Sequence, residues 1–251
     1  MRMRPFLNRA EFGVDQVGQV ASIHRYPVKS MAGEAIERSW LAGSGLEGDR
    51  LYAFESSGAP AGMLRLTGRE RREMLLYQPV LRSDGKVEVE VPTGEKLLVD
   101  SPDMLDYLAT HIPDGNQFVL TQSLTPQTDV RPLSLISMQT IHQLSVELGQ
   151  GIDPRRFRAN LYLDLRGEPF REDRLVGQTL RVGSTARILI RERDPRCRFI
   201  TYDPEAPVAA DPLFALMKLL DREHQGRAGV YATIEEPGPI QAGDAVCVFT
   251  R

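Results

Sequence analysis

Short runs in which hydrophobic and polar residues alternate recur along the chain, and they are typical of half-buried β-strands. The clearest alternates through Val87, Val89 and Val91, turns at residues 92–95 and returns through residues 97–99, which predicts a hairpin. The same kind of pattern predicts further strands within residues 18–30, 51–56, 160–165, 178–183, 186–193, 229–236 and 244–250.

Helical signals are fewer. Ile141, Leu144 and Leu148 share one helical face within residues 137–151, and Gly149 ends the pattern. Two more helices are predicted at residues 101–111 and 211–226, each opening with a polar residue followed by proline. The fold is therefore expected to be mainly β with a few helices, an α+β class.

A polar segment with two prolines, residues 120–132, is the best candidate for a domain boundary. It divides the chain into residues 17–122 and 123–251. At 251 residues the chain is long enough for one large domain or two modest ones with full hydrophobic cores.

The composition narrows the class of protein. A hydrophobic fraction of 41% and a net charge of -3 are ordinary for a soluble protein and give no reason to expect nucleic-acid binding. The basic N-terminus lacks a following apolar run, and no window is long and apolar enough to cross a bilayer. We therefore expect a cytoplasmic protein without a membrane partner.

The basic residues are biased towards arginine. Of 31 lysines and arginines only Lys29, Lys86, Lys96 and Lys218 are lysines. Genomic base composition can explain most of this excess. Alternatively, some arginines clamp a phosphate or carboxylate through two parallel hydrogen bonds, which lysine does less well.

The two cysteines differ in setting. Cys197 lies between Arg196 and Arg198, where positive charge on both sides favours the thiolate, although a small buried hydrophobe is the alternative. Cys247 falls in an alternating apolar strand, where a buried structural role is the better interpretation. Two cysteines cannot build a four-thiolate zinc site or an iron–sulfur cluster.

Three other stretches place polar side chains at strand ends or turns: Lys29 and Ser30 in YPVKS, Arg50 in GLEGDR, and Arg158 and Asn160 in RRFRAN. Taken singly, each residue can be solvated surface charge or a local pair. No Walker loop, GxGxxG, HExxH or GxSxG motif is present.

In combination these stretches resemble the MOSC family, the molybdenum cofactor sulfurase C-terminal domain proteins. The resemblance covers nearly the whole chain and rests on VASIHRYPVKSMAGE, GLEGDR, RPLSLISMQTIHQL, RRFRANLYLD, RCRFITYDP and GVYATIEEPGPIQAGDAV. It implies a β-barrel MOSC domain at residues 123–251, preceded by a smaller β-rich N-terminal module at residues 17–122.

The resemblance also implies an activity: a molybdenum enzyme related to the mitochondrial amidoxime-reducing component and to bacterial reductases of N-hydroxylated compounds. Cys197 then ligates molybdenum of the molybdenum–molybdopterin cofactor and is the catalytic residue. The implied cofactor-binding residues are Lys29, Ser30 and Arg50 for phosphate and pterin, Arg158 and Asn160 from the other side, Thr201 and Asp203 around the metal loop, and Ser137 and Thr140 at a helix start. For Ser137, helix capping is the alternative explanation.

The implied partners are a small N-hydroxylated substrate (an amidoxime, a hydroxylamine or an N-hydroxylated base analogue) and a separate electron-donor protein of ferredoxin or flavin-reductase type. Arg198, Phe199 and Ile200 differ from the residues of many relatives, which leaves the substrate range open. A molybdenum cofactor carrier, or a sulfur carrier with a persulfide on Cys197, are the alternative functions.

Overall fold

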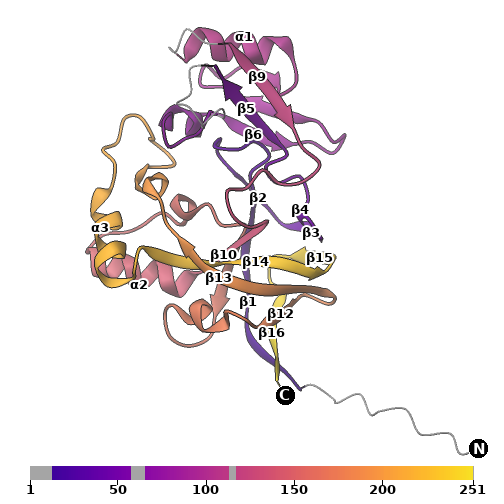
Figure 1. Cartoon of the computed structure of the whole chain (residues 1–251), viewed down its shortest axis with the longest axis vertical. Coiled ribbons are helices and arrows are strands. Elements are labelled where there is room, and N and C mark those ends of the chain that lie inside the picture. Colours follow the sequence, from indigo (N-terminus) through magenta and orange to yellow (C-terminus); the bar gives the residue numbers. More distant parts are fainter. Residues whose placement is uncertain (1–12, 58–65, 113–116, 251) are drawn as a thin grey trace, which may run out of the picture.

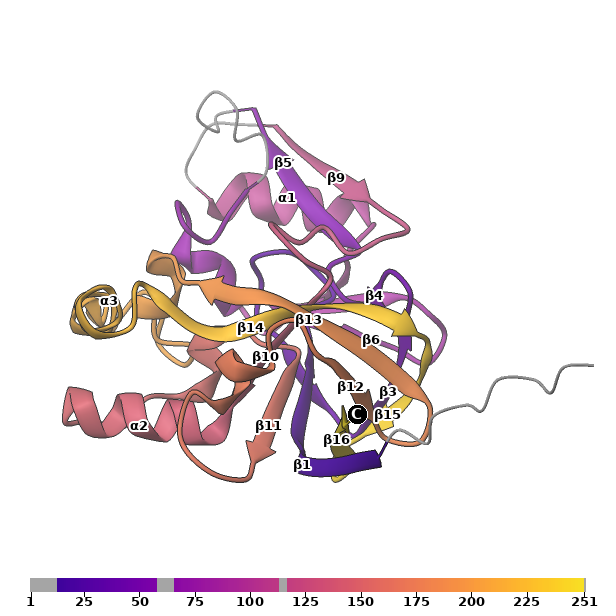
Figure 2. The same ribbon diagram turned by 60° about the horizontal axis from the view of Figure 1, so that its bottom comes forward.

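The computed structural model describes residues 13–57, 66–112 and 117–250. A closed seven-stranded barrel forms its larger part, with strands in the order β11-β10-β14-β13-β12-β16-β1 and β1 pairing back to β11 (Figures 1 and 2). The barrel strands are β1 (Gly13–Arg25), β10 (Leu133–Ser137), β11 (Leu161–Leu165), β12 (Thr179–Val182), β13 (Ala186–Pro195), β14 (Arg227–Glu236) and β16 (Ala245–Thr250).

The barrel interior explains the alternating sequence pattern. In β13, for example, Ala186, Ile188 and Ile190 are buried and face the barrel core, while the residues between them are partly exposed. β10 is different, because all five of its residues are buried. Its inner face belongs to the barrel core, and Ile136 on its other face packs under the helices outside the barrel.

Two helices cover the barrel on one side, α2 (Met138–Leu148) and α3 (Phe214–Glu223), as Figure 1 shows. Ser137 caps α2 by accepting a hydrogen bond from the Thr140 amide, and Gly149 ends it with a left-handed φ of 74°. An apolar cluster that includes Ile141, Leu144 and Leu216 fills the space between the helices and the barrel.

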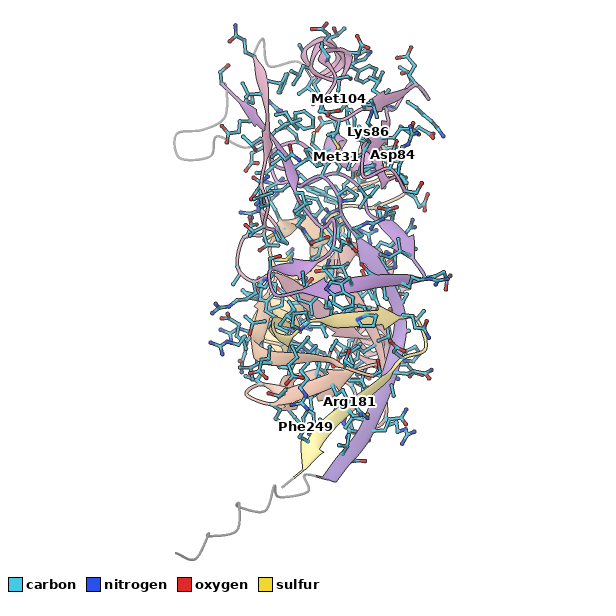
Figure 3. The ribbon with its side chains drawn as sticks, turned by 90° about the vertical axis from the view of Figure 1, so that its right-hand side faces the viewer. Met31, Asp84, Lys86, Met104, Arg181 and Phe249 are labelled. Carbon is cyan, nitrogen blue, oxygen red and sulfur yellow. The ribbon has the colours of Figure 1, made fainter. Side chains whose placement is uncertain are left out.

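A smaller domain, residues 52–122, sits on one end of the barrel (Figure 1). Phe54 and Met104 are almost fully buried in its core, which is completed by Met31 from the turn that follows β1. Met31 and Met104 both lie in the upper part of Figure 3. Its elements are β5 (Tyr52–Ser56), β6 (Gln78–Leu81), β7 (Val87–Glu90), β8 (Lys96–Leu98), α1 (Pro102–His111) and β9 (Phe118–Gln122).

Short strands complete the structure: β2 (Glu34–Ile36), β3 (Arg38–Ala42), β4 (Gly45–Leu46) and β15 (Gly238–Gln241). β2 extends the barrel sheet beside β1, whereas β3 pairs with β15 from the far end of the sequence. Turns of 3₁₀ helix occur at Arg72–Leu76, Pro154–Phe157, Arg171–Leu175 and Arg198–Thr201.

The expected class, mainly β with a few helices, is confirmed, as are the predicted hairpin β7–β8 and all three predicted helices. α3 begins at Phe214, three residues after the predicted start, and no side chain caps it. No helix among the described residues is both long and apolar enough to pass through a membrane.

The barrel structure predicts that the same substitution has very different effects on stability at two positions of β1. Val20 is 1% exposed in the barrel core and Val14 is 44% exposed near the start of the strand. Val20→Ala should lower the free energy of unfolding by about 2 kcal/mol, because it removes two buried carbons and leaves a cavity. Val14→Ala, the same change in the same strand, should cost less than about 0.5 kcal/mol in urea denaturation. Equal losses at the two positions would contradict the packing of β1.

Candidate functional site

A cleft lies between the small domain and the adjoining end of the barrel. It holds about 840 Å³ of empty space, its open mouth included. Turns at residues 29–30, 67–69 and 127–131 form one side, and the barrel loops at residues 156–160 and 194–200 form the other. Six of the residues expected from the sequence line it together: Lys29, Ser30, Arg50, Arg158, Asn160 and Cys197.

The turn that carries Lys29 and Ser30 is fixed from both ends. Val28 and Met31 are fully buried in the small-domain core, so the two residues between them are directed to the cleft wall. The Lys29 amide donates to the Tyr52 carbonyl at 2.8 Å, and Ser30 has a left-handed φ of 71°. This conformation is costly for serine and persists because its neighbours are anchored.

Arg50 is held by the buried carboxylate of Asp49. The Arg50 Nη1 atom lies 2.5 Å from Asp49 Oδ2, while Asp49 Oδ1 accepts a hydrogen bond from the Tyr26 amide at 2.8 Å. Arg50 Nη2 also donates to the Arg158 carbonyl at 3.2 Å. The guanidinium is therefore locked in place where the two parts of the cleft wall meet.

Arg158 is the exceptional cation of the cleft. Its guanidinium lies 4.3 Å from the centre of the Tyr26 ring, over which Arg50 also lies at 4.5 Å. No carboxylate of the described residues lies within 4.0 Å of it. Burial, together with the positive charge of Arg50, lowers the pKa of Arg158 to about 10, so it remains a cation at neutral pH. An anion in the cleft would supply the paired partner that this partly buried cation lacks among the described residues.

Backbone strain is concentrated here. Five non-glycine residues of the described chain have φ in the left-handed region, and three of them are Ser30, Arg50 and Arg158. Such residues cost free energy and gather where a site requires a particular geometry. Backbone strain and side-chain charge are independent observations, and both indicate that the cleft is the functional site.

Asn160 connects two barrel strands. Its Oδ1 accepts hydrogen bonds from the amide and the hydroxyl of Ser134, and its Nδ2 donates to the His24 carbonyl at 3.3 Å. These bonds use the oxygen fully and one of the two N–H groups, which leaves one N–H for another acceptor.

Cys197 is exposed at the cleft, which excludes the buried-hydrophobe interpretation. Of the two flanking arginines, Arg196 is paired with Asp194 at 2.9 Å, and both side chains are buried. Arg196 also donates to the carbonyls of Phe157 and Ala228. Its charge is therefore used to fix the loop at residues 194–200.

Cys247 is 4% exposed inside β16, as its sequence pattern predicted. Its Sγ atom lies 3.6 Å from the Nη2 atom of Arg181. Arg181 lies at the lower end of the barrel in Figure 3, opposite the small domain. Both cysteines are free thiols.

Thr201 and Asp203 lie behind the cleft wall and hold the loop that follows Cys197. Arg156, which lines the cleft, donates to the Thr201 carbonyl at 2.8 Å and pairs with Asp203 at 2.7 Å. The Asp203 carboxylate also accepts hydrogen bonds from the amides of Glu205 and Ala206. This geometry suits the loop-shaping part expected of the two residues.

Ser137 and Thr140 do not line the cleft. Both are fully buried: Ser137 Oγ caps α2 by accepting from the Thr140 amide, and Thr140 Oγ1 accepts from the amide of Phe170, which precedes the 3₁₀ turn Arg171–Leu175. The amide of Ser137 donates to Glu172. These contacts give both residues a structural explanation.

Asp129 was not expected from the sequence. Its carboxylate lies 2.5 Å from Lys29 Nζ and also pairs with Arg69, so it holds two cations of the cleft. Burial acts to raise its pKa, but the hydrogen bond and charge of Lys29 and the charge of Arg69 outweigh burial and keep the pKa below its ordinary value. Asp129 lies in the polar segment that the sequence indicated as a boundary, where nothing but its polarity marked it.

Among the residues that line the cleft, Cys197 is the single thiol available to a metal ion. The described residues contain no group of three or more histidine, cysteine or acidic side chains placed to hold a metal ion. Cys197 alone could supply a soft ligand, so a metal here would need most of its ligands from elsewhere.

Together these features define a two-part β-barrel protein with a cationic interdomain cleft and one exposed thiol. Two family models match the sequence: the MOSC domain over residues 124–247 and the MOSC N-terminal beta barrel domain over residues 17–127. The chain belongs to the MOSC domain family and carries the N-terminal module of that family. MOSC domains are associated with the molybdenum cofactor.

Among solved structures, the chain is similar to the YUAD protein from Bacillus subtilis, with a TM-score of 0.54 and 14% identity over 96% of this chain and 99% of that one. This likeness shows the fold. YiiM from Escherichia coli matches with a TM-score of 0.41 and 15% identity, over 90% of this chain and 70% of that one. No curated protein matches the sequence.

The cleft predicts competition between Asp129 and an added anion. Asp129→Asn should raise the affinity for sulfate, a dianion at all ordinary pH values, about two- to fivefold, because it removes the competing carboxylate that pairs with Lys29 and Arg69. Since the pKa of Asp129 is lowered below its ordinary value, its carboxylate stays charged near neutral pH and the gain should be constant from roughly pH 5 to 8.

Isothermal titration calorimetry at fixed ionic strength measures this difference. Asp84→Asn is the matched control, because Asp84 is equally exposed and also pairs with an arginine, Arg82, but lies outside the cleft. Equal sulfate affinity in wild type and Asp129→Asn would show that sulfate does not bind at Lys29 and Arg69.

Proposed function

We propose that this protein binds the molybdenum cofactor in the interdomain cleft and reduces N-hydroxylated compounds with electrons from a separate donor protein. The observation that carries the proposal is that the exposed thiol of Cys197 lines the same cleft as three cations. These are Lys29, Arg50 and Arg158, and Arg158 is not paired with a carboxylate of the described residues. Family membership supports it, because MOSC proteins include molybdenum cofactor enzymes.

The residues present fit such a group on three counts. A pterin cofactor carries a phosphate, and Arg158 is a desolvated cation without a carboxylate partner. Asn160 has an N–H to spare for a pterin acceptor. Arg196, which lines the cleft, has a buried Nη2 atom with no hydrogen-bond partner among the described residues.

When bound, the cofactor supplies the two-electron redox chemistry that no side chain of this protein offers. Cys197 would be the protein's ligand to the metal, as a thiolate. Lys29, Ser30 and Arg50 would hold the phosphate from the small-domain side, and Arg158 and Asn160 would hold the pterin from the barrel side. The anchored turns described above keep these groups in position before anything binds, which lowers the entropic cost of binding.

The proposed reaction is balanced by two electrons and two protons. The N–O bond of the substrate breaks, the nitrogen gains a hydrogen atom in place of its hydroxyl group, and the oxygen leaves as water. The two cysteines of this sequence cannot hold a plant-type iron–sulfur cluster, so the proposal assigns the electrons to a separate protein. A ferredoxin- or flavin-type reductase is the class of donor that we propose.

The second candidate function is transfer: a carrier of the molybdenum cofactor, or a sulfur carrier with a persulfide on Cys197. The exposure of Cys197 favours it, because a thiol that passes on its load must be accessible to a partner. A carrier releases its cofactor readily, whereas an enzyme retains it through many turnovers.

Metal analysis of protein from a cofactor-competent host tests the proposal. Wild type should contain close to one molybdenum per chain, and Cys197→Ser should lose at least about nine-tenths of it, because serine replaces the soft ligand. Cys247→Ser, the same substitution in the barrel core, should keep its metal. Arg158→Gln should lower pterin content, because it removes the unbalanced cation.

Activity then separates the two functions. Loaded wild type should reduce an amidoxime with a viologen as electron donor and retain molybdenum after many turnovers, while Cys197→Ser should be inactive. Folded wild type with neither molybdenum nor pterin would refute the cofactor assignment. Loaded protein that loses its cofactor to an acceptor without turnover would favour the carrier.

A further inference from the structure

Phe199 connects the two domains within the cleft that Cys197 also lines. It lies two residues after Cys197, in the same 3₁₀ turn, and lines the cleft. Across the cleft it meets Gly68 of the small domain: a Cβ atom at Gly68 would lie 2.1 Å from Phe199 Cε2 and 2.7 Å from Cζ. The edge of the ring therefore rests against the backbone of the turn at residues 67–70, where only glycine fits.

The ring is also held on its other sides. The Arg158 guanidinium lies 5.0 Å from its centre, and the Tyr202 ring meets it edge-on at 5.8 Å. The hydroxyl of Tyr202 donates to the Arg69 carbonyl at 3.2 Å, a second contact with the same turn of the small domain. Phe199 cannot turn away from Gly68 without disturbing these contacts.

The position of this ring limits the space next to Cys197. The thiol is open to solvent, so small molecules reach it, but on the side of Phe199 and Gly68 the room is bounded by a fixed aromatic ring and by backbone. A flat group can lie along such a wall, whereas a branched group of the same length would overlap it.

We infer that Phe199, seated against Gly68, is a specificity-determining residue that admits flat, unbranched groups to the position of Cys197 and excludes branched ones. In the proposed function, on which this part rests, the substrates are N-hydroxylated compounds whose N–O group is attached to a planar or unbranched skeleton. The geometric part concerns access to Cys197 and does not require the cofactor.

Alkylation of Cys197 in cofactor-free protein tests the access directly. In a Cys247→Ser background the rates are measured with N-methylmaleimide, N-phenylmaleimide and N-tert-butylmaleimide. Each protein is described by the ratio of its rates, in which the thiolate fraction cancels because all three reagents attack the same sulfur. Cys197→Ser gives the background.

The parent protein should react well with the methyl and phenyl reagents and poorly with the tert-butyl reagent. Phe199→Ala should raise the tert-butyl to methyl ratio at least about tenfold, and Phe199→Leu should raise it less, because a site that gains room loses this order of discrimination against a larger group. Phe214→Ala, which removes a half-exposed phenylalanine outside the cleft, should leave the ratio unchanged.

A double-mutant cycle tests the contact itself. Gly68→Ala should lower the melting temperature of the parent and have a smaller effect in the Phe199→Ala background, because the methyl group then has room. If the ratio of the tert-butyl to the methyl reagent rate is unchanged in both Phe199 variants, the inference is overturned, even if the double-mutant cycle shows that Phe199 and Gly68 interact. Absence of molybdenum from the wild type would refute the proposed function and leave the maleimide result valid.

Discussion

Closure of the barrel by β1 is the constraint on which the cleft depends. β1 pairs with β11 on one side and β16 on the other, so the first described strand joins two strands from the C-terminal half. The chain leaves β1 at Arg25 and passes at once through Tyr26 to the turn with Lys29 and Ser30. The barrel therefore fixes the position of groups that belong, by sequence, to the N-terminal module.

The charges of the cleft follow from the same arrangement. Asp49 neutralises Arg50, Asp194 neutralises Arg196 and Asp203 neutralises Arg156, and each of these pairs stabilises a loop. Arg158 alone among these arginines has no such partner within the described residues, although it is desolvated and close to Arg50. A folded protein keeps such a group only where the rest of the structure over-determines its position, and here Tyr26 and Phe199 do so.

The sequence predicted the features that are local. Half-buried strands alternate, so β7, β13 and β16 were found, while β10 was missed because both of its faces are buried. Residues 120–132 were predicted as a domain boundary because the segment is polar, and the polar residues at its end, Gln127, Thr128, Asp129 and Arg131, line the cleft. The sequence could not distinguish whether Ser137 binds a cofactor or caps a helix, because a hydroxyl side chain at a helix start suits both roles. The meeting of Gly68 with Phe199 is non-local, and no pattern along the chain could indicate it.

Strands β5 and β9 also determine how the small domain is attached. Tyr52 is paired with Gln122, so the chain enters and leaves the small domain at adjacent positions of one two-stranded ribbon. In topological terms the small domain is an insertion into a barrel whose own strands lie before and after it in the sequence. Changes of length or sequence within the insertion leave the register of every barrel strand untouched. Sequence changes can therefore remodel the part of the cleft wall at residues 67–69 while the loop that carries Cys197 keeps its place in the barrel.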